Sequence, residues 1–303
     1  MSDPEAQRFD VVVVGAGIAG LSAATTAAGL GLSVVVLEQL GPGGQLLDSS
    51  TVQDDELGEQ PAADLAAAAM ERAMDAGAVL EFTNASKLVP GERHLVETDA
   101  GIYSGAAVVL AMGSTPSRVE IPGEVEFAGR GVSYCVACDG PLFSGKPVVL
   151  LGAGRYAAKE AQELREFVSQ ITVISLDDSD AEVGSAGSLE TGGNLQLIRG
   201  AKPVSIEGEG SVSGIRVIHE DRELQLDALG VFVCAGRTPA TDLVRELVEL
   251  DLEGRIVVDD SLNAGRPGLY AVGDVRAHSP QRISSAAADG VTAANSIAIH
   301  FNH

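Results

Sequence analysis

FDVVVVGAGIAG, residues 9–20, is an apolar run rich in valine that ends in a glycine cluster. The valines predict a buried strand, and the alanine-rich stretch 18–29 after the glycines predicts a helix. A second apolar run, 33–37, ends at Glu38. Residues 9–38 therefore form a predicted β-turn-α-β unit.

The glycines of this unit have the GxGxxG spacing of a dinucleotide-binding loop. At Gly15, Gly17 and Gly20 the missing side chains let the backbone approach a pyrophosphate held at the helix N-terminus. Glu38 closes the second strand, where an acid accepts hydrogen bonds from a ribose. The residues that we expect to contact the dinucleotide are Gly15, Gly17, Ile18, Ala19, Gly20 and Glu38.

The same pattern occurs again in the middle of the chain. An apolar run at 147–151 leads into glycines at 152 and 154, a helix-like stretch at 156–168 and a further apolar run at 171–174. Two such units indicate two nucleotide-binding-type domains. The predicted fold class is α/β, with two Rossmann-like three-layer dinucleotide-binding domains, one inserted in the other.

Two short segments with glycine and proline mark the crossings between these domains. They are GSTP at 113–116 and GRTP at 236–239. We expect the first domain to comprise residues 1–117 and 244–303, and the inserted domain to comprise residues 118–243. The second segment of the first domain contains an apolar run that ends in Gly-Asp at 273–274 and a helix-like stretch at 283–299.

Composition excludes several classes of function. The formal net charge is −23 and only four lysines occur in 303 residues, so binding to nucleic acid is not expected. No run of 18 apolar residues occurs, which predicts no membrane span. The first eight residues lack the basic region of a secretory signal, so the expected location is the cytoplasm.

The chemical centre is the stretch Cys135-Val136-Ala137-Cys138-Asp139. Two intervening residues let the sulfurs reach disulfide distance in a tight turn that opens a helix. The helix N-terminus lowers the pKa of a thiol there, which favours attack as the thiolate, and Asp139 is placed to pass a proton to a sulfur. A zinc site needs further ligands at matching spacing, which are absent, so we predict redox chemistry and no metal. Cys234, the third cysteine, lies in an apolar run and is expected to be a buried small hydrophobe.

These motifs, in this order, resemble the low-molecular-weight thioredoxin reductase family, FAD-dependent disulfide oxidoreductases, over nearly the whole chain. The shared motifs are GxGxxG at Gly15, GGQL at 43–46, the Cys135–Asp139 box, GxGxxA at 152–157, GRTPAT at 236–241 and Gly273-Asp274. The resemblance implies a homodimer with FAD in the interrupted domain and a thioredoxin-like protein as substrate. It assigns Cys138 to the flavin side, Cys135 to attack on the partner disulfide, and Asp139 as acid. It adds to the flavin site Gly44, Gln45, Leu46, Asp54, Gly113, Gly273, Asp274, Arg282 and Ile283.

The sequence departs from this family where the family binds NADPH. The family has His-Arg-Arg at the end of the second strand of the inserted domain, and its arginines hold the 2′-phosphate. Here Ser175, Leu176 and Asp177 stand at those places. A carboxylate repels a phosphate dianion, so NADPH is disfavoured. Three alternatives remain open: NADH held through Asp177, a second FAD at 152–157, or a vestigial site with electrons arriving from ferredoxin or another one-electron carrier. The ferredoxin-dependent, deeply rooted and diflavin branches of the family lose the same motifs.

Smaller departures lie near the first flavin site and at the end of the sequence. Arg282-Ile283-Ser284 replaces the family's Arg-Gln-Ala, and Val52-Gln53-Asp54 replaces its Val-Glu-Asn. The tail after residue 299 is either a frayed end or a cover over the flavin through Phe301 or a terminal histidine. Two other functions remain open: a dithiol oxidase that uses FAD and O₂, and a flavin-bound regulatory protein whose cysteines sense redox state.

Overall fold

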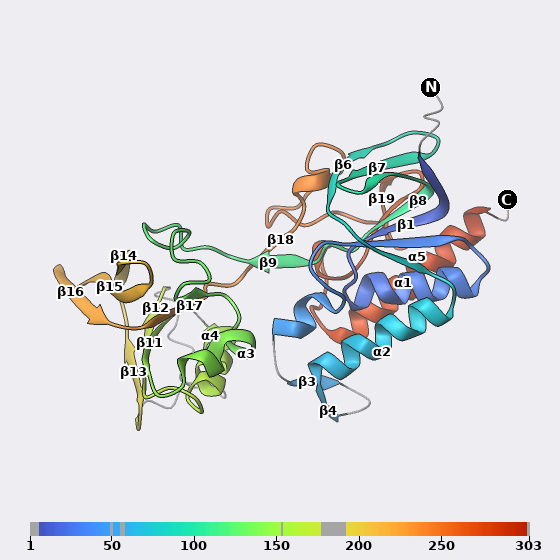
Figure 1. Cartoon of the computed structure of the whole chain (residues 1–303). Coiled ribbons are helices and arrows are strands. Elements are labelled where there is room, and N and C mark those ends of the chain that lie inside the picture. Colours follow the sequence, from blue (N-terminus) through green and yellow to red (C-terminus); the bar gives the residue numbers. More distant parts are fainter. Residues whose placement is uncertain (1–5, 49–50, 55–57, 153, 177–191, 302–303) are drawn as a thin grey trace. The chain divides into compact units, whose positions relative to one another are not determined.

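The computed structural model of the chain describes residues 6–48, 51–54, 58–152, 154–176 and 192–301. The chain divides into two compact units (Figure 1). Met1–Thr115 and Pro239–His303 form the first unit, and Pro116–Thr238 forms the second. The chain crosses between the units at β9 (Ser114–Pro116) and β18 (Arg237–Pro239), two short strands that pair with each other.

The second unit begins at Pro116 and ends at Thr238, whereas we expected boundaries at 118 and 243. The difference at the C-terminal boundary has a physical cause. Ala240 N–H donates to the Gly113 carbonyl at 3.0 Å, and Val244 is fully buried in the core of the first unit. Residues 239–243 therefore pack with the first unit rather than with the inserted one.

A parallel sheet with an antiparallel edge strand forms the centre of the first unit. Its strands are β1 (Gln7–Val14), β2 (Val34–Glu38), β5 (Val79–Phe82), β8 (Gly101–Leu110), β19 (Asn263–Arg266) and β20 (Leu269–Ala271), in the order β19-β20-β8-β1-β2-β5. β1 pairs in parallel with β2 on one side and with β8 on the other. This central position explains why its valines are buried on both faces of the sheet.

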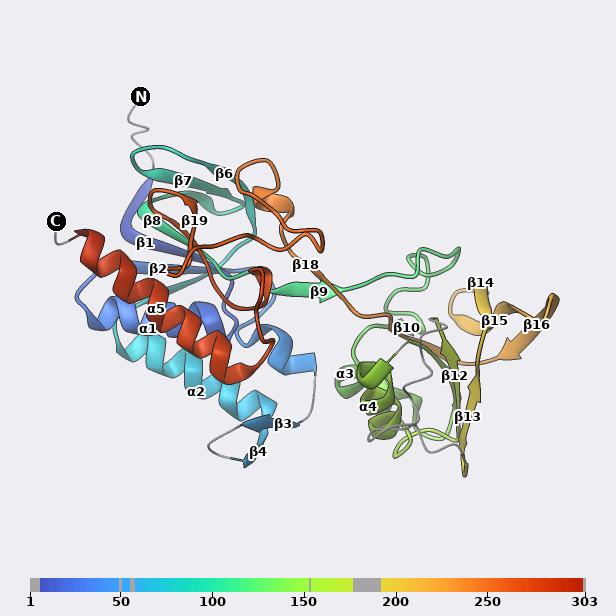
Figure 2. The ribbon, with the colours of Figure 1, turned by 180° about the vertical axis from the view of Figure 1, so that it is seen from behind.

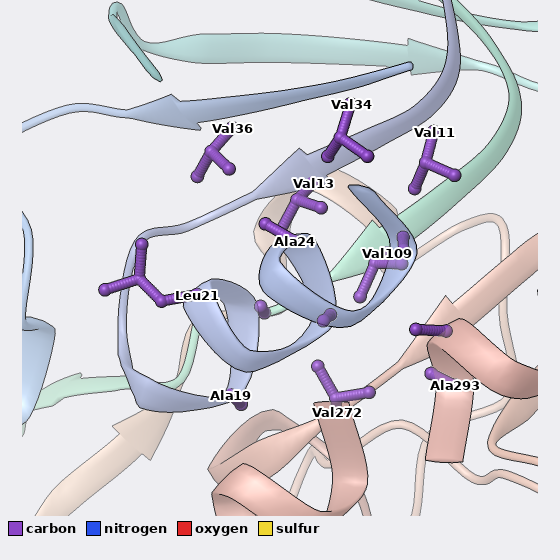
Figure 3. Close-up of a cluster of buried hydrophobic side chains, with 14 of the residues drawn as sticks. Val11, Val13, Ala19, Leu21, Ala24, Val34, Val36, Val109, Val272 and Ala293 are labelled. Atoms are coloured by element: carbon purple, nitrogen blue, oxygen red, sulfur yellow. The ribbon is translucent and has the colours of Figure 1, made fainter. Parts of the chain in front are cut away.

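Three helices cover one face of this sheet: α1 (Ile18–Gly29), α2 (Ala62–Asp75) and α5 (Ile283–Phe301) (Figure 2). Alternate residues of β1 point to opposite faces. Val11 and Val13 pack against Leu21 and Ala24 of α1 (Figure 3). The small residues of α1 and α5 let the two helices approach closely, since a Cβ on Gly290 would lie 2.3 Å from the Ala19 carbonyl oxygen.

An antiparallel layer covers the other face. β6 (Ala85–Val89) pairs with β7 (His94–Thr98), and β7 pairs with β8. Leu88 and Val96 of this layer pack with Val12 and Val14 of β1. The unit thus has three layers, helices, parallel sheet and antiparallel strands (Figure 1). A separate hairpin, β3 (Thr51–Asp54) and β4 (Gly58–Pro61), precedes α2.

The second unit repeats this three-layer plan. Its parallel sheet has the order β10-β17-β11-β12-β13, and an antiparallel sheet has the order β14-β15-β16. The strands are β10 (Val132–Ser133), β11 (Pro147–Gly152), β12 (Gln170–Ser175), β13 (Leu195–Ile198), β14 (Lys202–Gly208), β15 (Val212–His219), β16 (Arg222–Asp227) and β17 (Gly230–Cys234). Val148 and Leu150 face α3 (Val136–Asp139) and α4 (Gly154–Leu164). Val149 and Leu151 face the antiparallel sheet.

The helices differ from expectation mainly at α4. It begins at Gly154 and ends at Leu164, whereas the sequence predicts a helix over 156–168. After Leu164 the chain tightens into turns, because both Phe167 N–H and Val168 N–H donate to the Leu164 carbonyl. Among the residues that the structure describes, no helix has the length and hydropathy required to cross a membrane.

Candidate functional site

The glycine loop of the first unit lies between β1 and α1 and is packed too closely for side chains at two positions. Gly15 has a φ of +102°, and a Cβ there would lie 2.5 Å from the Ala111 carbonyl oxygen. A Cβ on Gly20 would lie 2.0 Å from the Gly15 carbonyl oxygen. These glycines are therefore required by the turn and by the contact between α1 and β8.

Gly17 is different, because a Cβ there would meet no atom of the described chain within 4 Å. It is the N-cap of α1, its φ is −72°, and no side chain accepts a hydrogen bond from the first turn. No acidic residue lies in that turn. The space in front of Gly17, faced by the N–H groups of a twelve-residue helix, is the kind of place that holds a phosphate.

Glu38 lies next to this loop at the end of β2. Its Oε2 accepts a hydrogen bond from Ala16 N–H at 2.8 Å, and its Oε1 accepts from Leu40 N–H at 2.8 Å and Gly41 N–H at 3.2 Å. Three backbone donors fix the carboxylate beside the glycine loop. Each carboxylate oxygen has two lone pairs, so capacity remains for a ribose hydroxyl.

The segment from Gly43 to Leu46 packs directly on the glycine loop. Gly43 N–H donates to the Ala16 carbonyl at 2.8 Å, and a Cβ on Gly44 would lie 3.3 Å from Gly17 Cα. Leu46 follows in a short 3₁₀ helix, Gly44–Asp48. Its side chain shares a small apolar cluster with Ile18 and Ile283, so three of the predicted residues meet there.

Gln45 connects this segment to Asp274, which follows strand β20 of the parallel sheet. Its Nε2 donates to Asp274 Oδ2 at 3.2 Å, across 229 positions of sequence. A Cβ on Gly113 would lie 3.2 Å from the same Nε2. Gly273 has a φ of +74°, and a Cβ there would lie 2.8 Å from Ala19 Cβ. Gly113, Gly273 and Asp274 thus lie close to Gln45 and to the glycine loop.

The other two residues predicted for the flavin site are Arg282 and Asp54. Arg282 is exposed at the start of α5, where its backbone N–H and carbonyl both bond to Ser285 Oγ. These contacts belong to the helix start and place no side-chain atom at the glycine loop. Asp54 ends β3, and its side chain lies outside the described residues.

Three further residues around Asp274 were missed by sequence reasoning. Ser279 Oγ donates to Asp274 Oδ1 at 3.2 Å. Asp289 accepts from Gly273 N–H at 2.9 Å and forms an ion pair with Arg276. One feature of the sequence could have identified Asp289. It is the one carboxylate in an alanine-rich apolar helix, and a charge buried there requires a partner.

These features fit FAD. The glycine loop has open space in front of Gly17. The carboxylates of Glu38 and Asp274 lie in the turns next to this loop. The α1 N-terminus fits a pyrophosphate, and the two carboxylates fit ribose and ribityl hydroxyls. Each lies at the carboxyl end of a strand of the parallel sheet, where ligands of such folds bind.

The redox-active cysteines lie in the second unit, between β10 and α3. Cys135 and Cys138 form a disulfide with a Cα–Cα distance of 5.3 Å. Cys135 is the N-cap of α3, and its Sγ accepts a hydrogen bond from Cys138 N–H at 3.1 Å. Cys135 is half-buried whereas Cys138 is exposed. The disulfide is therefore accessible, and the one-turn helix fixes its geometry.

Two flanking residues complete this site. Ser133 Oγ accepts from Cys135 N–H at 3.1 Å and donates to the Cys135 carbonyl at 3.2 Å, which fixes the approach to the turn. Asp139 is half-buried at the last position of α3. It is the residue directly after Cys138, at the position predicted for a proton donor to the sulfurs. Val136 points into the core beneath the turn.

Cys234 is buried at the end of β17. Burial raises the pKa of its thiol, and the nearby charge of Glu160 raises it further. Such a thiol is unreactive, which agrees with the expected packing role. In the part of the chain that the structure describes, no three His, Cys, Asp or Glu side chains are grouped to hold a metal ion.

The second glycine loop, after β11, is also tightly packed. A Cβ on Gly152 would lie 2.6 Å from Ala157 Cβ and 2.9 Å from the Cys234 carbonyl oxygen. Ser175 is buried at the end of β12. Leu176 follows and packs, partly buried, against the apolar cluster between the two sheets. The predicted contribution of Asp177 lies outside the described residues.

Two three-layer dinucleotide-binding units, one with a phosphate-type glycine loop and one with a Cys-x-x-Cys disulfide, define a flavin-dependent disulfide oxidoreductase. Residues 9–290 match the family model of the pyridine nucleotide-disulphide oxidoreductases. The chain therefore belongs to this family, whose members use FAD. The α/β fold class and the enzyme class predicted from the sequence are confirmed.

Known proteins of similar sequence and structure indicate which type of disulfide oxidoreductase the chain resembles. The chain is 34% identical to a thioredoxin reductase of Treponema pallidum over 97% of both chains. Among solved structures it is similar to the T. acidophilum thioredoxin reductase, with 31% identity, a TM-score of 0.85, and coverage of 98% of this chain and 100% of that one. A ferredoxin-flavin thioredoxin reductase of Clostridium acetobutylicum is 26% identical, with a TM-score of 0.54 and coverage of 98% and 99%. The chain is thus of the thioredoxin reductase type.

Proposed function

We propose that this enzyme reduces the disulfide of a thioredoxin-like protein with electrons supplied through bound FAD. The observation that carries the proposal is the Cys135–Cys138 disulfide at the start of α3, exposed at Cys138 and held by the hydrogen bond from Cys138 N–H to Cys135 Sγ. An accessible disulfide in a short turn is suited to exchange with another disulfide. The full-length similarity to thioredoxin reductases supports the same substrate class.

The residues that would hold FAD are those gathered around the first glycine loop. Gly17 and the N-terminus of α1 would face the pyrophosphate, Glu38 a ribose, and Asp274 the ribityl chain. Gln45 orients Asp274 through its hydrogen bond. FAD, when bound, supplies two electrons to a disulfide and can itself be reduced in one-electron or two-electron steps.

The two cysteines would act by thiol–disulfide exchange with the disulfide of the partner protein. Uptake of two electrons and two protons converts the Cys135–Cys138 disulfide to two thiols. Asp139 takes the proton of the Cys135 thiol, and the Cys135 thiolate attacks one sulfur of the partner disulfide. This forms an intermolecular disulfide and releases the other partner sulfur, which takes that proton from Asp139. The Cys138 thiol then gives up its proton and attacks Cys135 Sγ, which restores the intramolecular disulfide and releases the second partner sulfur, which takes up the proton.

We infer that the electron donor is ferredoxin or another one-electron carrier rather than NADPH. Leu176 stands where the thioredoxin reductases have the first of the two arginines that hold the 2′-phosphate, Ser175 stands at the preceding histidine, and Leu176 packs, partly buried, against the apolar core. Neither side chain carries the guanidinium that recognises a phosphate. Similarity to a ferredoxin-flavin thioredoxin reductase supports the same donor. Two molecules of a one-electron carrier would deliver the two electrons of each turnover.

The decisive experiment is an anaerobic titration of the purified flavoprotein with NADPH, NADH and photoreduced ferredoxin, followed by flavin absorbance. We expect ferredoxin alone to bleach the flavin rapidly, after which a thioredoxin disulfide reoxidises it. Rapid bleaching by NADPH would contradict the proposed donor and leave the disulfide reductase activity intact. A flavin content of two per chain would identify a second FAD at the 152–157 loop.

We further propose that the enzyme is a cytoplasmic homodimer, as the resemblance implies. Sedimentation of the flavin-loaded protein gives its mass, and a value twice that of the 31.0 kDa chain is expected. A sedimenting species of 31.0 kDa at micromolar concentration would contradict the dimer.

A further inference from the structure

Asp289 and Arg276 form a largely buried ion pair beside the predicted flavin site. Arg276 Nε donates to Asp289 Oδ2 at 2.6 Å, and Nη2 donates to Oδ1 at 2.8 Å. The side chain of Arg276 is only 14% exposed, and that of Asp289 only 10%. The paired contacts match the planar guanidinium to the carboxylate, the geometry in which such pairs are strongest.

The same carboxylate also holds the backbone of the Gly-Asp turn. Asp289 Oδ2 accepts a hydrogen bond from Gly273 N–H at 2.9 Å. Gly273 has a left-handed φ of +74°, and a Cβ there would lie 2.8 Å from Ala19 Cβ at the first turn of α1. Any movement of Gly273 therefore moves the neighbouring Asp274 relative to the glycine loop.

Helix packing fixes Asp289 against that loop. The next residue, Gly290, lies so close to α1 that a Cβ there would be 2.6 Å from Ala23 N. Asp289 is thus on a rigid element that is already in register with α1. Arg276 occupies the opposite end of the turn, and its Nη1 also donates to the Ala277 carbonyl at 3.1 Å. The turn from Gly273 to Ala277 is therefore held at both ends.

We propose that Asp289 and Arg276 are positioning residues for the flavin: together they set the position of Asp274 and so the affinity of the site for FAD. The inference rests on the proposed placement of FAD at the first glycine loop. Their contacts are with each other and with the backbone of the turn, so we assign their effect on the flavin to the Gly273–Asp274 turn. A buried ion pair is a weak source of net stability compared with apolar packing, so a role in placing a functional side chain is the better account of it.

The test compares FAD affinity with stability in two conservative variants. Asp289→Asn keeps the shape and one acceptor for Gly273 N–H but loses the charge that pairs with Arg276. Arg276→Lys keeps the charge and loses the paired geometry. The control is Glu207→Gln in the second unit, which changes a carboxylate contact of similar length, to Arg216 Nε at 2.8 Å, in an exposed pair whose side chains are 40% and 41% exposed. FAD binding to flavin-free protein is measured by quenching of flavin fluorescence, at a temperature where circular dichroism shows every variant folded.

We expect Asp289→Asn to raise the Kd for FAD at least about tenfold, Arg276→Lys several-fold, and Glu207→Gln less than twofold. Values within twofold of wild type for both variants, with only a lower melting temperature, would show that the pair is structural and overturn the proposal. If Asp289→Asn does not fold, Arg276→Lys decides alone. Failure of the wild-type protein to bind FAD would instead overturn the proposed function, and the positioning role with it.

Discussion

The Tyr134 hydroxyl donates a hydrogen bond of 2.8 Å to Glu124 Oε1, a carboxylate that is 1% exposed. Tyr134 immediately precedes Cys135. The same carboxylate accepts from Val119 N–H at 3.1 Å and Glu120 N–H at 2.6 Å. Glu124 therefore links the segment that enters the second unit to the residue next to the redox disulfide. Burial, and next the hydrogen bond to Glu124, raise the pKa of Tyr134 to about 12.

Replacing Tyr134 with phenylalanine leaves the buried Glu124 with only its backbone donors. Loss of a hydrogen bond to a charged, buried acceptor costs about 1.5–3 kcal/mol. We expect Tyr134→Phe to lower the free energy of unfolding by about that amount in chemical denaturation. Tyr270→Phe is the matched control, because the hydroxyl of Tyr270 bonds to the neutral amide of Asn263. Equal losses in the two variants would contradict a special role for the Glu124 carboxylate.

Local pattern accounts for the elements that the sequence predicted correctly. The valine run of residues 9–14 and the alanine-rich stretch 18–29 have the composition of a buried strand and of a helix, and β1 and α1 follow them closely. The Cys-x-x-Cys disulfide was also predictable, since its cysteines are three positions apart. Each of these features depends on neighbours in sequence.

The residues that sequence reasoning missed depend on distant partners. Asp289 bonds to Gly273 across 16 positions, and Gln45 bonds to Asp274 across 229. Gln45 was found only through the resemblance to a known family, because no periodicity marks it. Asp289 and Glu124 are acids in apolar surroundings, and only the tertiary structure identifies the donors that let them be buried.

His94 makes the stability of the first unit depend on pH. Its side chain is 3% exposed, and its Nε2 lies 3.1 Å from the Pro267 carbonyl oxygen, to which the neutral ring donates. Burial, and to a smaller extent the charge of Arg266, lowers its pKa below the ordinary 6.5. A pKa lowered on folding favours the folded state above 6.5, and this contribution is lost as the pH falls toward the lowered value.

We therefore expect the free energy of unfolding to fall as the pH drops below about 6.5, before most carboxylates titrate. His94→Gln is the comparison, because glutamine can donate to the Pro267 carbonyl and does not titrate. Denaturation curves at pH 7.5, 6.5 and 5.5 should show a smaller decrease in this variant than in the wild type. Parallel decreases in both proteins would assign the pH dependence to other groups.

Gly17 and Gly20 offer a test that separates the flavin site from the fold. A Cβ at Gly17 would meet no atom of the described chain within 4 Å, whereas a Cβ at Gly20 would lie 2.0 Å from a carbonyl oxygen. We expect Gly17→Val to fold with a melting temperature close to that of flavin-free wild type but to lose bound FAD. Gly20→Ala should lower the melting temperature of the flavin-free protein itself. Normal flavin content in Gly17→Val, measured by absorbance, would show that the pyrophosphate lies elsewhere.

The two cysteines can be assigned their roles by trapping. If Cys135 attacks the partner and Cys138 resolves the product, Cys138→Ser leaves a thiol that forms an intermolecular disulfide and cannot release it. We expect reduced Cys138→Ser, mixed with a thioredoxin variant whose single active-site cysteine is activated as a disulfide with thionitrobenzoate, to give a covalent complex on non-reducing gels that dithiothreitol reverses. Cys135→Ser should give much less complex under the same conditions, and Cys234→Ser in the Cys138→Ser background should not diminish it, since the Cys234 thiol is buried. More complex from Cys135→Ser than from Cys138→Ser would reverse the assignment, and the greater exposure of Cys138 would then identify it as the attacking sulfur.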